Sequence, residues 1–146
     1  MEDIIILIGR ILFGLVFLLS GIGHLRSRAA MTAYAQAKGV PAAGAMVVIT
    51  GIMLILGSLS IILGIFPEIG ALLLIIFLLP TTFMMHAFWK ETDPMMKMSE
   101  QSSFFKGLAL LGGALMIFAW AAGMHQMADE RALFVVSNDS VIMLEN

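Results

Sequence analysis

Two histidines, a tryptophan and a lysine are the residues of this sequence whose types and spacing are best suited to chemistry. His24 ends the first long apolar stretch. His86 and Trp89 end the third, and Lys106 begins the fourth. Apolar stretches that cross a membrane in alternating directions bring these four positions to one membrane side. Because protonated imidazole and ammonium groups donate hydrogen bonds to carbonyl oxygens, we expect a quinone head group to bind among them.

The same residues allow other interpretations. Histidine, lysine and tryptophan side chains also anchor helix ends among lipid head groups, which needs no ligand. Two histidines from different helices can ligate haem or a metal. Thioether and imidazole groups suit Cu(I), so Met95 and Met98 with His86 are weak candidates for a copper site.

The chain carries no recognisable catalytic motif. A nucleophile motif, paired catalytic carboxylates, a phosphate-binding loop and a nucleotide fingerprint are all missing from the sequence. The sequence therefore predicts no catalytic residues and weighs against an enzyme. A quinone is the one cofactor that its residues favour.

Four apolar windows must position these side chains. They cover residues 4–25, 42–66, 69–89 and 106–124, and their only charged residues are Arg10 and, at the edge of the last window, Lys106. Each window has the length that a helix needs to cross a hydrocarbon core of about 30 Å. We therefore predict an all-α integral membrane protein, a four-helix bundle formed by residues 1–125 in contact with the lipid bilayer.

The composition agrees with this class. Hydrophobic residues make up 60% of the 146 residues and charged residues only 12%, whereas soluble domains carry about 25% charged residues. The formal net charge of −2 gives no basic surface for nucleic acid, and the absence of cysteine excludes thiol chemistry and iron–sulfur ligation.

The distribution of lysine and arginine predicts the orientation. Arg26, Arg28 and Lys38 follow the first window, and Lys90 and Lys97 follow the third. By the positive-inside rule both loops are cytoplasmic and both termini face outward. We expect a multi-pass protein of the plasma membrane.

Two further polar positions lie inside the windows. Arg10 either extends to the outer head groups or pairs with an internal acceptor, for which Glu68 is the nearest candidate. Pro80 removes one backbone hydrogen bond from the third window, and hydroxyls such as that of Thr82 satisfy groups freed in this way. Thr82 and His86 are four residues apart and share a helix face.

Small residues recur every seven positions in the second window, at Gly44, Gly51 and Ser58. Stripes of this kind let helices approach closely in lipid. We interpret the stripe as packing within one bundle, with a homo-oligomer face as the alternative.

The last segment, residues 126–146, is predicted to lie outside the membrane. Two runs rich in β-forming residues, 132–136 and 141–144, flank a polar turn and favour a small β-hairpin. Such a hairpin is marginal alone, so we expect it to lie against the bundle, a second copy or another subunit. The alternative is a disordered tail that happens to be apolar.

From Gly9 to Met116 the chain resembles the DoxX family of small four-helix membrane proteins. The resemblance is carried by the segments 9–14, 20–25, 37–41, 51–57, 63–66, 86–89 and 104–110, which read GRILFG, SGIGHL, AKGVP, GIMLILG, LGIF, HAFW and FFKGLAL. The family is named after membrane subunits of a thiosulfate:quinone oxidoreductase and terminal quinol oxidase. The resemblance thus implies a four-helix plasma-membrane protein with a quinone connection.

The chain departs from the family at three positions. Relatives often have Lys where His24 stands, Glu where Leu54 stands and Asp where Ala87 stands. These are the groups best suited to proton handling. We therefore expect a non-catalytic accessory subunit that packs into a larger respiratory or redox membrane complex. A quinone-linked oxidoreductase subunit is the first alternative, and a Cu(I)- or haem-binding membrane protein is the second.

Overall fold

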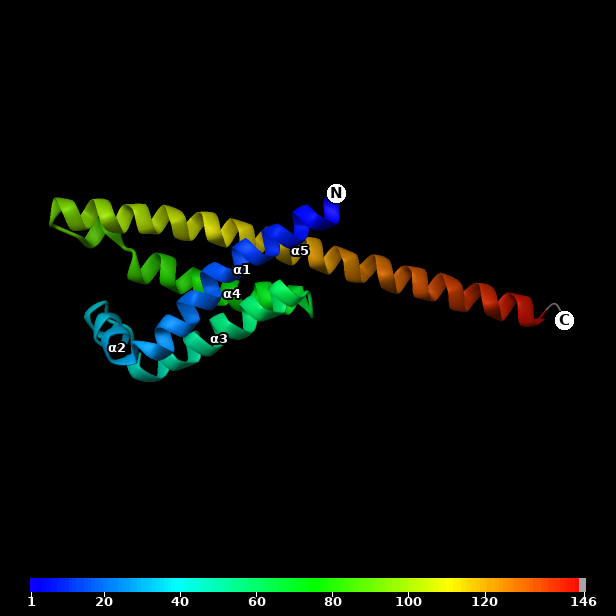
Figure 1. Cartoon of the computed structure of the whole chain (residues 1–146), viewed down its shortest axis with the longest axis horizontal. Helices are drawn as coiled ribbons and strands as arrows, with labels where there is room; N and C mark the ends of the chain where they lie inside the picture. Colours follow the sequence, from blue (N-terminus) through cyan, green and yellow to red (C-terminus); the bar gives the residue numbers. More distant parts are fainter. Residues whose placement is uncertain (145–146) are drawn as a thin grey trace.

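The computed structural model describes the backbone of residues 1–144 and the side chains of residues 1–131 apart from His125. Every element in that range is helical (Figure 1). The five α-helices are α1 (Glu2–Arg26), α2 (Arg28–Ala37), α3 (Ala43–Leu63), α4 (Pro67–Pro80) and α5 (Pro94–Leu144). A π-helical turn, η1 (Thr81–Met85), and a 3-10 turn, η2 (Phe88–Lys90), lie between α4 and α5.

Four helical segments are long and apolar enough to cross a membrane. Among the described residues they are α1, α3, the segment Pro67–Lys90 from α4 to the end of η2, and the part Pro94–Arg131 of α5. The short helix α2 joins α1 to α3 and is not among them. The predicted all-α class with four spans is thereby confirmed, and the chain is a multi-pass membrane protein.

The helices pack in the order of the chain, with α1 against α3, α3 against α4, and α4 against α5. The core contains Phe17 of α1, Leu54 and Ile61 of α3, Leu74 of α4 and Ala114 of α5. Many other large apolar side chains face outward from the bundle. Lipid tails are as apolar as these side chains, so the outward-facing surface suits a bilayer.

Glycines bring three of the helices into backbone contact. A Cβ atom on Gly21 of α1 would lie 2.8 Å from the carbonyl oxygen of Gly51 in α3. A Cβ atom on Gly70 of α4 would lie 2.7 Å from the carbonyl oxygen of Gly57 in α3. Lipid gives no hydrophobic driving force for helix association, so close van der Waals packing of this kind stabilises the helix pairs instead.

The small-residue stripe of α3 also faces the interior. Ser58 is fully buried and donates a hydrogen bond of 2.9 Å to the Ile55 carbonyl. Gly44 makes a looser contact, because a Cβ atom there would lie 3.7 Å from Thr32 of α2. Gly44, Gly51 and Ser58 therefore all lie against other parts of the same chain.

The predicted C-terminal hairpin is wrong. Helix α5 continues without a break through both proposed strands and ends at Leu144, beyond the rest of the bundle (Figure 1). The apolar β-branched runs suggested strands, but no glycine or proline follows Gly123 to end a helix. Extending an existing helix costs little compared with starting a new element, so the helix continues.

Helix α5 also begins earlier than the fourth window. Asp93 Oδ1 accepts a hydrogen bond of 2.8 Å from the backbone N–H of Met96, and Pro94 is the first helical residue. This is a side-chain cap followed by a proline whose missing N–H costs nothing at that position. The turn places residues 94–105 on a helix rather than in a loop.

We predict that Gly21→Ala lowers the free energy of unfolding by about 1–3 kcal/mol, because its methyl group meets the α3 backbone. Gly23→Ala is the matched control on the same helix, since nothing lies within 4 Å of a Cβ atom there. Thermal unfolding in detergent, followed by circular dichroism, compares the two variants. Equal effects would contradict the proposed close packing.

Candidate functional site

One cavity of about 580 Å³ lies within the bundle and is lined by residues from α1, α2, α3, α4, η1 and α5. Its lining is mainly apolar, with Val16, Phe17 and Leu110 among its members. The polar side chains that line it are those of Ser20, His24, Tyr34, Thr50, Thr81, Thr82, His86, Ser103 and Lys106. The structure therefore brings together three of the four residues proposed for a quinone site, namely His24, His86 and Lys106.

The local sequence around Pro80 opens this part of the bundle. Helix α4 ends at Pro80, which has no backbone N–H to donate, and the chain continues through the wider π-helical turn η1. Thr82 of this turn is almost fully buried. A Cβ atom on Gly107 would lie 2.5 Å from Thr82 Oγ1, so the glycine lets α5 approach η1 closely. Pro80 and Thr82 both line the cavity.

His24 is held within its own helix. Its Nδ1 lies 2.8 Å from the backbone carbonyl oxygen of Ser20. Its ring also makes an edge contact with Phe77 of α4, with ring centroids 6.0 Å apart. The imidazole thus has a fixed orientation at the cavity wall.

His86 is held by a carboxylate from α5. Its Nδ1 lies 2.8 Å from Glu100 Oε2, and only 9% of Glu100 is exposed. The other oxygen, Oε1, accepts hydrogen bonds from Lys38 Nζ at 3.0 Å and from the Tyr34 hydroxyl at 3.4 Å. Lys38 Nζ also donates to Glu91 Oε1 at 2.9 Å.

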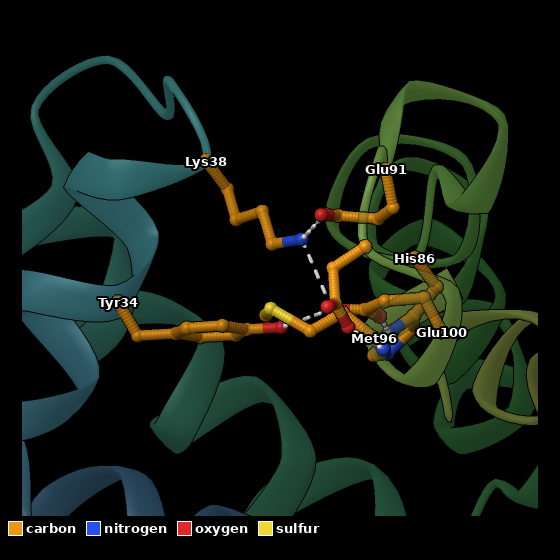
Figure 2. Close-up of polar contacts among 7 residues, drawn as sticks. Tyr34, Lys38, His86, Glu91, Met96 and Glu100 are labelled. Atoms are coloured by element: carbon orange, nitrogen blue, oxygen red, sulfur yellow. Dashed lines mark hydrogen bonds and ion pairs between the residues drawn. The ribbon is translucent and has the colours of Figure 1, made fainter. Parts of the chain in front are cut away.

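These five residues, Tyr34, Lys38, His86, Glu91 and Glu100, form what we call the polar cluster. Figure 2 shows Tyr34 of α2 and Lys38, directly after the end of α2, reaching toward the three residues on the opposite side. The polar cluster joins α2 to the segment after α4 and to the second turn of α5. It thereby fixes α2 beside the cavity, where Tyr34 and His86 are themselves part of the lining.

The charges in the polar cluster stabilise one another. The hydrogen bond to Glu91 raises the pKa of Lys38 above its ordinary value; burial opposes this shift, and the hydrogen bond to Glu100 and its negative charge add to it. Burial raises the pKa of Tyr34, and the negative charge of Glu100 adds to this shift. Lys38 therefore remains a cation between two carboxylates, and Tyr34 remains a neutral hydroxyl that donates.

Sequence reasoning missed the acidic partner of His86. Ala87 offers no carboxylate, which left the histidine without an apparent neighbour in the chain. The structure supplies the carboxylate from Glu100, fourteen residues later. Charge complementarity could have indicated this contact. The loop with Lys38 contains no acidic residue, while the segment after the third window contains Glu91 and Glu100.

Trp89 is not part of the cavity lining. Its ring packs at 5.2 Å from Phe88 and 5.6 Å from Phe104, measured between ring centroids, and it is half exposed. The position suits an aromatic side chain at the membrane interface.

Met95 and Met98 also lie outside the cavity lining, on the exposed surface of the first turns of α5. Within the part of the chain that the structure describes, no group of three or more His, Cys, Asp or Glu side chains is placed to hold a metal ion.

Arg10 caps a helix at the other end of the bundle. Its Nε donates to the Ile61 carbonyl at 2.7 Å, and its Nη2 donates to the Ile62 carbonyl at 2.9 Å. These carbonyls belong to the last turn of α3, which has no further helical N–H groups to pair with them. Gly64, with a φ of +72°, ends this turn and leaves room for the guanidinium group. Arg10 therefore has acceptors inside the protein.

We predict that Lys38→Met lowers the free energy of unfolding by about 1–3 kcal/mol, because it leaves the Glu91 and Glu100 carboxylates without their cation. Adding Glu100→Gln should recover part of this loss. The control is Lys97→Met, an exposed lysine near the same end of the bundle. Thermal unfolding in detergent measures all three. A loss no greater than that of the control would contradict the stabilising role of Lys38.

Comparison with known proteins agrees with this architecture. The model of the DoxX family matches residues 5–87, which is more than half of the 146 residues and includes His24 and His86. No curated protein and no solved structure matches the chain. With four helices able to span a membrane and this match, the chain belongs to the DoxX family.

Proposed function

We propose that this DoxX-family protein binds a quinone in its cavity and serves as a membrane subunit of a larger redox complex. The observation that carries the proposal is the convergence of His24, His86 and Lys106 on one apolar cavity of about 580 Å³. Ligand sites commonly have volumes of about 300–1,000 Å³ and a mainly apolar lining with a few polar groups. The cavity meets both conditions.

The residues present fit an amphipathic ring. Apolar side chains such as Phe17 and Leu110 suit the ring and the start of an isoprenoid tail, while His24, His86 and Lys106 offer polar partners for the oxygen-bearing groups of the ring. A bound quinone would supply reversible two-electron chemistry. The protein would bind it, orient it and limit its contact with water.

We infer that the polar cluster lies at the cytoplasmic side of the plasma membrane. Lys38 contacts Glu91, so the basic segment between α1 and α3 and the segment between α4 and α5 lie at the same end of the bundle. The positive-inside rule assigns such an end to the cytoplasm. The N-terminus would then face outward.

Helix α5 favours an accessory role in assembly. It has 51 residues, which corresponds to about 76 Å and is more than twice the thickness of a hydrocarbon core. Its C-terminal part projects beyond the other helices (Figure 1). A projecting helix of this length offers a docking element for another membrane subunit or for a second copy.

We predict that protein purified from native membranes in mild detergent carries bound quinone or its quinol, and that His86→Ala lowers the total amount per protein by about fivefold. The reason is the loss of one hydrogen bond between the imidazole and the ligand in an apolar site, about 1 kcal/mol. Trp89→Phe is the control, because Trp89 is outside the cavity lining and phenylalanine keeps its aromatic contacts. Extraction and chromatography quantify the quinone and quinol. A wild-type preparation without either would refute the proposal.

The assembly role predicts a second result. Deleting residues 126–146 should release the proteins that co-purify with the full chain and leave the quinone content unchanged. The bundle and the cavity lining lie before this segment. Mass spectrometry of the purified complexes provides the measurement. Identical partner sets in the two preparations would remove the C-terminal part of α5 as the docking element.

A further inference from the structure

We propose that the cavity selects the reduced form of its ligand, a quinol or related ring with hydroxyl groups, and that Glu100 is the positioning residue for this choice. The inference rests on the proposed function, because it assigns the chemical form of the same ligand. It follows from which nitrogen of each cavity histidine carries a hydrogen atom.

The hydrogen position of His24 follows from its partner. Nδ1 lies 2.8 Å from the carbonyl oxygen of Ser20, and a carbonyl oxygen only accepts hydrogen bonds. Nδ1 must therefore carry the hydrogen atom. In the neutral ring, Nε2 then has a lone pair and accepts. It is the ring nitrogen that can face a ligand.

The same reasoning applies to His86. Nδ1 lies 2.8 Å from Glu100 Oε2, and an ionised carboxylate only accepts. Lys38 and Tyr34 both donate to the other oxygen of this carboxylate, which favours the ionised form and holds it in place. Nδ1 of His86 thus carries the hydrogen atom, and Nε2 of the neutral ring is again an acceptor.

Two imidazole acceptors in the lining of one cavity require donors on the ligand. A quinol hydroxyl donates to Nε2 and also accepts a hydrogen bond from a group such as the Lys106 ammonium. A quinone carbonyl only accepts, so it can use Lys106 but leaves both imidazole lone pairs unsatisfied. An unsatisfied polar group in an apolar site costs about 1–3 kcal/mol. The quinol is therefore the better complement.

The test uses three ligands of one ring: tetramethylhydroquinone, tetramethylbenzoquinone and the dimethyl ether of the hydroquinone. Their binding to the full chain in detergent is measured by calorimetry without oxygen, so the readout is affinity. We expect the hydroquinone to bind on the order of tenfold more tightly than the other two.

Two variants test the positioning role. Glu100→Gln replaces an acceptor by an amide that both donates and accepts, so it no longer fixes the hydrogen atom on Nδ1 of His86. We expect it to reduce the preference for the hydroquinone severalfold. Glu130→Gln, the same change at an exposed position of α5, should retain the preference.

Each outcome bears on one claim. Equal binding of the three ligands to the wild-type protein overturns this inference while the proposed function stands. Tighter binding of the benzoquinone than of the hydroquinone also overturns it. Failure of all three to bind overturns the proposed function together with the inference. These wild-type comparisons decide the matter even where Glu100→Gln does not fold.

Discussion

A carboxylate enclosed at the end of a membrane helix must have its charge matched, and this constraint organises the end of the bundle that holds the cavity. Glu100 is nearly buried, and both of its oxygens accept hydrogen bonds. Oε1 accepts hydrogen bonds from Tyr34 of α2 and from Lys38, which follows α2. Oε2 pairs with Nδ1 of His86, which follows η1. The position of α2, the orientation of His86 and the start of α5 therefore depend on one side chain.

The rest of the bundle depends on close backbone contact instead of charge. Gly21 and Gly51 join α1 to α3, and Gly57 and Gly70 join α3 to α4. At the opposite end, Arg10 pairs with backbone carbonyls of α3. The cavity thus lies within helices held by glycine contacts, while its polar residues are oriented by the polar cluster.

The sequence was sufficient for the class of the protein and for most of its spans, because length and apolar composition follow directly from the thickness of a bilayer. It also predicted that His24, His86 and Lys106 lie near one side of the membrane, since helix ends on one side can be inferred from topology alone, and all three line the cavity. It could not show that Trp89 is outside the cavity lining, because the break at Pro80 changes the direction of the residues that follow.

The pairing of His86 with Glu100 depends on tertiary contact between η1 and α5, which no local pattern encodes. The tail was misread for a different reason. Residue preferences for strands are weak compared with the ease of extending a helix, and the polar residues at 137–140 do not break one. Strand propensity is therefore a poor guide to secondary structure where a long helix already precedes the segment.

Helix α5 has a mechanical consequence. No proline follows Pro94 within it, so it runs from Pro94 to Leu144 as one helix that curves at most gently. Glu100 and Lys106 are near one end of this helix, and the other end lies outside the bundle (Figure 1). Glu100, Lys106 and the projecting segment therefore belong to one continuous helix, and a change in the tilt of this helix would move them together.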